Sequence, residues 1–106
     1  MRIVILITAA SKFEARRIAK SLIENKLAAC VNILGEIESL FIWKSKVDTA
    51  KEVLLVVKSR KENLNKIIKL VKSLHSYDVP EIIALPIVGG SKTYLDWIDE
   101  SIRQSA

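Results

Sequence analysis

The segment "LHSYDVPEIIAL", residues 74–85, gathers several side chains that could do chemistry. It holds the only histidine of the chain, His75, together with Tyr77, Asp78 and Glu81. An imidazole beside carboxylates could bind a metal ion or act as a general base oriented by a carboxylate. A histidine at the end of a helix could equally interact with the exposed carbonyls and the helix dipole. The residues alone do not decide among these three roles. Because no nucleophile motif accompanies His75, we predict no enzymatic activity.

The chain offers few soft metal ligands. A structural zinc site needs about four ligands, usually closely spaced cysteines and histidines. Here one cysteine, Cys30, accompanies the one histidine, and the two are far apart in sequence. One subunit therefore cannot build such a site, although an interface between copies could combine donors. Cys30 fits a small buried hydrophobic residue or a thiol that prefers copper.

Two repeated patterns position these residues. Apolar β-branched runs at 3–7 and 53–57 indicate buried strands, each followed by a possible capping serine, Ser11 or Ser59, with a glutamate three residues later. Helical apolar stripes follow, and each leads into a further strand, "LAACVNIL" and "EIIALPIV". Two β-α-β units joined by a hairpin predict a ferredoxin-like βαββαβ sandwich of the α+β class, one domain over residues 1–106. A short C-terminal helix carries Tyr94 and Trp97 beside its stripe.

The centre of the chain predicts an unusually long hairpin arm. In "EIESLFIWKS", Ile37, Phe41 and Trp43 share one face and Leu40 and Ile42 share the other, with "KVDTA" as the expected turn. A lone arm has no core to cover two apolar faces, and an exposed edge invites aggregation. We therefore expect other copies of the chain to cover it.

Composition and charge limit the classes of partner that we expect for this chain. The net charge of +5 is compatible with anionic partners, but the lysines are spread along the chain. The RNA-recognition module needs aromatic residues on a strand that here reads "EVLLVVKS", so nucleic acid is not expected. No apolar stretch approaches the roughly 20 residues of a membrane span. A lone cysteine fits a reducing compartment, and we expect a cytoplasmic protein with no membrane partner.

Five segments in order resemble the CutA family, which is linked to divalent-cation tolerance. They are "LAACVNIL", "SLFIWKSKV", "KEVLLVVKS", "LHSYDVPEIIALPI" and "YLDWI". The departures are Phe41 for a tyrosine, Ser45 for a glycine and Ser76 for a proline. Some relatives also carry a cysteine near the end of the first strand, where Ile7 stands here.

The resemblance implies a homotrimer similar to the PII signalling proteins, with clefts between subunits. It marks as cleft residues Lys58, Glu52, Tyr77, Glu81, Asn32 and Trp43, which would suit a small polar or anionic ligand. The trimer interface is predicted to include Phe41, Ile42, Leu40 and Trp97.

The resemblance further implies a non-enzymatic role in the response to copper or other divalent cations, with weak binding and no obligatory cofactor. Because the first-strand thiol is absent, His75 is the first candidate ligand for Cu²⁺ and Cys30 the second. The alternative is a PII-like sensor module that binds a metabolite in the cleft between subunits.

Overall fold

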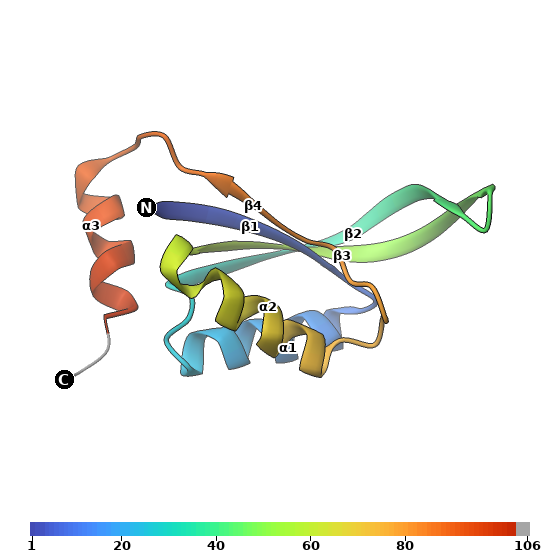
Figure 1. The fold of residues 1–106 in the computed structure, drawn as a ribbon, viewed down its shortest axis with the longest axis horizontal. Helices are drawn as coiled ribbons and strands as arrows, with labels where there is room; N and C mark the ends of the chain where they lie inside the picture. The colour runs from blue at the N-terminus through green and yellow to red at the C-terminus, as the bar shows by residue number, and fades with distance from the viewer. Residues whose placement is uncertain (104–106) are drawn as a thin grey trace.

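The computed structural model describes residues 1–103, in which helices pack against a sheet of long strands (Figure 1). Its elements, in chain order, are β1 (Arg2–Ala9), α1 (Lys12–Glu24), β2 (Cys30–Trp43), β3 (Lys46–Arg60), a 3-10 turn η1 (Lys61–Asn63), α2 (Leu64–Leu74), β4 (Ile82–Pro86) and α3 (Lys92–Ser101). The βαββαβ order with a C-terminal helix confirms the predicted ferredoxin-like fold.

The sheet has four strands in the order β2-β3-β1-β4, and every neighbouring pair is antiparallel. β1 lies in the middle and pairs with β3 over its whole length, from Arg2 opposite Arg60 to Ala9 opposite Val53. Helices α1 and α2 lie side by side across one face of this sheet (Figure 1). The arrangement follows from alternation in β1, whose odd positions are apolar and turn toward the helices.

The core fills the space between the sheet and these two helices. Ile5, Ile7, Leu55 and Val57 contribute from the strands and are fully buried. Ile18, Leu22, Ile67 and Val71 meet them from the helical stripes that the sequence predicted. Burying a side chain of this size contributes roughly 1.5–3 kcal/mol each. This core fixes the ends of the strands, and with them the loops that carry the polar residues.

The predicted start of the first helix is confirmed, whereas the predicted start of the second is wrong. Ser11 Oγ accepts a hydrogen bond from the Glu14 amide at 3.1 Å and caps α1. Ser59 does not cap α2, because β3 runs on to Arg60 and the Ser59 hydroxyl is buried and donates to the Leu27 carbonyl oxygen. Pairing with β1 thus outweighs the local capping preference of a serine.

The hairpin of β2 and β3 projects beyond the rest of the sheet (Figure 1). β1 pairs only with residues 53–60 of β3, so residues 36–52 form a two-stranded ribbon. The sequence analysis predicted a turn at "KVDTA", and this prediction is wrong, because these residues form the first part of β3. The turn is the two-residue pair Lys44 and Ser45, with φ of 51° and 66°. Positive φ at both central residues is what a tight hairpin turn requires.

α3 is held at the opposite end of the sheet from the hairpin tip (Figure 1). Its Ile98 is fully buried, and Asp99 accepts hydrogen bonds from Arg2 at 2.8 Å and from Arg60 at 2.7 Å. Arg2 and Arg60 are cross-strand partners, so one carboxylate joins the helix to both strands. Among residues 1–103, none of the helices has the length and apolar character needed to cross a membrane.

Candidate functional site

A groove of about 770 Å³ lies between the hairpin, which it follows from Glu52 to Trp43, and the segment that follows α2. We call it the acidic groove. Its carboxylates are Asp48, Glu52, Asp78 and Glu81. Its hydroxyls are Thr8, Ser39, Thr49 and Tyr77. The remaining wall is apolar and is formed by Leu40, Phe41, Trp43, Ala50 and Val79.

Glu52 and Tyr77 join the two sides of this groove. The Tyr77 hydroxyl donates a hydrogen bond to Glu52 Oε2 at 3.1 Å. Glu52 is a buried carboxylate, only 7% exposed, and it stands where β2 carries a bulge between Gly35 and Ile37. Burial, together with the hydrogen bond and charge of Glu52, raises the pKa of Tyr77, so the phenol stays protonated and keeps donating.

His75 lies behind the groove, at the C-terminal cap of α2. Its side chain is fully buried, and both ring nitrogens have partners. Nε2 lies 2.7 Å from the Thr8 carbonyl oxygen, and Nδ1 accepts a hydrogen bond from the Tyr77 amide at 3.0 Å. This pattern fits a neutral ring protonated on Nε2. The imidazole thus positions the segment that carries Tyr77, and a metal ion would have to displace one of these bonds.

Glu14 is part of this arrangement, although the sequence indicated only a helix cap. Its Oε1 accepts from the Ala10 amide and its Oε2 from the Ser76 amide, both at 3.1 Å. Oε1 also lies 3.5 Å from His75 Nδ1. Burial alone would raise the pKa of Glu14, but the hydrogen bonds from Ser76 and Ala10 hold it below its ordinary value. Glu14 therefore links the start of α1 to the segment after α2.

Cys30, Asn32 and Lys58 lie elsewhere. Cys30 and Lys58 are cross-strand partners, and the Lys58 ammonium donates to Asn32 Oδ1. Tyr94 of α3 lies next to Cys30, and burial together with the thiol raises the pKa of Tyr94. Lys58 is six residues from Glu52 along β3, which corresponds to about 20 Å. The structure therefore brings together Glu52, Tyr77, Glu81 and Trp43 of the predicted cleft, and places Lys58 and Asn32 outside the acidic groove.

The two predicted metal ligands are also far apart within one chain. His75 contacts Thr8 in β1, whereas Cys30 is aligned through Lys58 with Val4. Four residues along a strand separate these levels by about 13 Å. Within residues 1–103, no three cysteine, histidine, aspartate or glutamate side chains are clustered closely enough to hold a metal ion.

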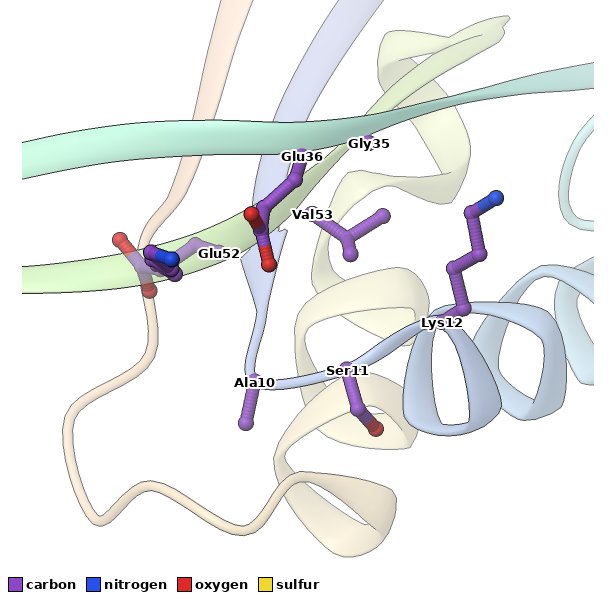
Figure 2. A pocket seen from close by; sticks show the side chains of 8 residues that line it. Ala10, Ser11, Lys12, Gly35, Glu36, Glu52 and Val53 are labelled. Atoms are coloured by element: carbon purple, nitrogen blue, oxygen red, sulfur yellow. The ribbon is translucent and has the colours of Figure 1, made fainter.

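A second hollow, of about 460 Å³, lies at the start of α1 (Figure 2). Lys12 and Lys51 line it together with Glu36 and Glu52, so its charges are mixed. Figure 2 shows the Glu52 carboxylate directed away from Ser11 and Lys12. The Ser11 hydroxyl already caps α1. This hollow therefore presents no set of groups that converges on one ligand.

The residues predicted for the trimer interface lie on the hairpin and on α3. Leu40 and Ile42 are 64% and 69% exposed, and Val47 opposite Ile42 is exposed as well. Phe41 is on the other face of the ribbon, where it pairs with Asp48 and lines the acidic groove. Trp97 is partly exposed on α3, and its ring centroid lies 5.4 Å from that of Tyr94.

Comparison with known proteins gives a consistent result over nearly the whole chain. The profile of the family described as CutA1 divalent ion tolerance protein matches residues 3–101. The divalent-cation tolerance protein CutA of Archaeoglobus fulgidus is 50% identical over 99 residues, which are 93% of this chain and 96% of that protein. The chloroplastic protein CutA 1 of Oryza sativa is 48% identical over 103 residues, 97% of this chain. This chain spans only 58% of that plant protein's length.

Solved structures agree with the fold. The structure described as the periplasmic divalent cation tolerance protein CutA from Archaeoglobus fulgidus superposes with a TM-score of 0.94, covering 97% of this chain and all of that one. The Thermus thermophilus divalent cation tolerance protein is 48% identical and also gives 0.94, covering 95% of this chain and 98% of that one. The family profile, the sequence relatives and the superposed structures together show that the chain belongs to the CutA1 divalent ion tolerance protein family.

Proposed function

We propose that this chain acts in divalent-cation tolerance as a non-enzymatic homotrimer that binds Cu²⁺ and similar cations weakly. The observation that carries the proposal is the family match over residues 3–101. The names of the similar proteins speak of cation tolerance, which favours this function over a metabolite sensor. The acidic groove adds a surface of negative charge on a chain whose net charge is +5.

Weak binding follows from where the donors lie. His75 can reach a metal only by giving up its bond to Thr8 or Tyr77, and leaving a buried polar group unpaired costs about 1–3 kcal/mol. Cys30 is partly accessible but has no second soft donor beside it among residues 1–103. A tighter site would need donors from more than one chain.

The trimer is supported by the hairpin. The ribbon of residues 36–52 exposes Leu40, Ile42 and Val47 on one face, far from the core. Ile42 and Val47 are cross-strand partners, and a contiguous apolar patch on a surface often marks a protein–protein interface. Identical copies arranged around an axis would cover one another's ribbons without leaving a free edge.

The lone cysteine also leads us to place the protein in the cytoplasm. Fractionation of the native host, with immunodetection of the chain, tests this placement. Recovery in the periplasmic or an organellar fraction would contradict it.

Calorimetric titration with Cu²⁺ tests the binding proposal. We expect weak binding by the wild type, further weakened in His75→Gln and in Cys30→Ser. Glutamine can still donate a hydrogen bond toward the Thr8 carbonyl oxygen, which favours a folded variant. Circular dichroism verifies that each variant is folded before its binding is compared. Glu24→Gln, an exposed change at the end of α1, is the matched control. If wild type and both variants show the same negligible heat, the copper assignment fails.

A further inference from the structure

The two helices that cover the sheet carry the net positive charge of the chain. α1 and α2 contain seven lysines and arginines and two glutamates, so together they account for the whole net charge of +5. The other residues are neutral overall. The lysines are spread along the sequence, but folding places α1 and α2 side by side and gathers their charge on one side of the molecule (Figure 1).

Helical periodicity turns these cations toward solvent. The buried residues of α1 form one stripe through Ala15, Ile18 and Leu22, and those of α2 are Ile67 and Val71. With about 3.6 residues per turn, the cations between these positions lie outside the buried stripes. Six of them are exposed and form what we call the basic helical face: Arg16, Arg17, Lys20, Lys66, Lys69 and Lys72.

The basic helical face has little internal neutralisation. None of its six cations forms an ion pair with another residue in the described range 1–103. Of the two glutamates in α1, Glu14 accepts hydrogen bonds from the Ala10 and Ser76 amides, and Glu24 is the last residue of the helix. Two copies of this face would repel each other, so we expect it to stay at the surface of a homo-oligomer.

Phe13 stands within this charged surface and is 79% exposed. It precedes Arg16 and Arg17 by three and four residues, which places its ring beside both guanidinium groups on the outer side of α1. An exposed aromatic ring surrounded by cations suits the boundary between lipid headgroups and acyl chains, where the ring meets apolar groups and the cations meet phosphates.

The shape of the face favours a membrane over nucleic acid. Both helices lie flat against the sheet, so neither stands out from the face to enter a DNA groove (Figure 1). A broad surface with several lysines and arginines matches the negative charge of a membrane rich in anionic lipid. Each cation that lies within a Debye length of such a membrane adds to the attraction.

We propose that the basic helical face binds the surface of membranes containing anionic phospholipid, with the Phe13 ring inserted between the headgroups. The attachment is peripheral and reversible. It revises the expectation of no membrane partner, which depended on the lack of an apolar span. The proposal goes beyond cation tolerance and requires neither Cu²⁺ nor the residues His75 and Cys30.

Cosedimentation of the native oligomer with vesicles tests the proposal. We expect binding to phosphatidylcholine vesicles containing one third phosphatidylserine, and none to vesicles of phosphatidylcholine alone. Binding should fall when NaCl is raised from about 0.05 M to about 0.5 M, because salt screens the attraction. Lys20→Glu combined with Lys69→Glu should weaken binding more than about tenfold. Phe13→Ala should weaken it several-fold by a factor that salt changes little, because that contribution is apolar.

Lys44→Glu combined with Lys92→Glu is the matched control, since it changes the net charge equally at the exposed hairpin tip and at the start of α3. It should retain binding. Equal losses in the two double variants, binding to phosphatidylcholine alone, or no binding to the anionic vesicles would overturn the proposal.

Two further results would assign the basic helical face to another partner and overturn the membrane proposal. One is tighter binding to a short DNA duplex than to the anionic vesicles, measured by fluorescence anisotropy. The other is dissociation of the oligomer by Lys20→Glu with Lys69→Glu, seen in sedimentation velocity, which would make this face a contact between copies. We expect weaker binding to the duplex and an unchanged oligomer mass.

Discussion

The Tyr77 hydroxyl donates to Glu52 Oε2 over 3.1 Å, and this bond fastens the segment after α2 to the base of the hairpin. The same segment is held from behind by His75, which accepts from the Tyr77 amide, and by Glu14, which accepts from the Ser76 amide. Three polar contacts therefore fix one wall of the acidic groove relative to the core.

Removing the Tyr77 hydroxyl should weaken this attachment. Tyr77→Phe is expected to lower the free energy of unfolding by about 0.5–1.5 kcal/mol, the usual net value of one hydrogen bond. Urea denaturation followed by circular dichroism measures it. Tyr94→Phe, a tyrosine of α3 outside the groove, is the comparison. Equal stability of Tyr77→Phe and wild type would mean that the bond contributes nothing.

His75 should contribute to the free energy of unfolding through the hydrogen bonds of its ring. His75→Ala leaves the Thr8 carbonyl and the Tyr77 amide without partners, so a loss of about 2–4 kcal/mol is expected. Thermal and urea denaturation in metal-free buffer provide the measurement. His75→Gln, which can still donate toward Thr8, should recover part of the loss. A fully stable His75→Ala protein would refute the structural role assigned to the ring.

Glu14 should contribute a stability that depends on pH. Because its folded pKa is lowered, the contribution is present above the unfolded pKa of about 4.3 and is lost as pH falls through the folded pKa. Glu14→Gln should therefore cost about 1 kcal/mol at neutral pH, and the difference from wild type should shrink below about pH 4. Urea denaturation of wild type and Glu14→Gln, repeated from neutral pH to below about pH 4, measures this difference, with Glu24→Gln as control. A difference that does not change with pH would rule out the linkage.

The hairpin turn offers a stabilising change. Ser45 has φ of 66°, a conformation that strains residues other than glycine. Ser45→Gly should raise the free energy of unfolding by up to about 1 kcal/mol, since glycine adopts this φ freely. Thermal denaturation of wild type and variant makes the comparison. Ser39→Gly, in the extended part of β2, should destabilise instead, and a stabilisation of similar size there would discount the turn explanation.

The sequence predicted the fold well where apolar periodicity decides it. The odd positions of β1 and the stripes of α1 and α2 form the core as expected. Local signals misled at Ser59 and at "KVDTA", because pairing of β3 with β1 and with β2 extends the strand over residues whose own preferences favour a cap or a turn. Long-range pairing is not encoded in neighbouring residues.

The site was only partly predictable for a similar reason. Alternation indicates that Glu52 and Lys58 share one face of β3, and their spacing of six residues places them about 20 Å apart along the strand. The sequence does not indicate that the acidic groove lies at the Glu52 end of the strand. Glu14 was visible only as a capping residue, since its contact with Ser76 spans 62 positions of the chain. The acidic character of the groove arises because Asp48 and Asp78, from distant segments, line the same volume.

The central claim is that identical copies cover the apolar ribbon of the hairpin. Sedimentation velocity at micromolar protein concentration tests it most directly. We predict a single species with three times the 11.9 kDa chain mass, and dissociation when Ile42 and Val47 are both replaced by Glu. A stable, folded species of 11.9 kDa in the wild type would contradict it.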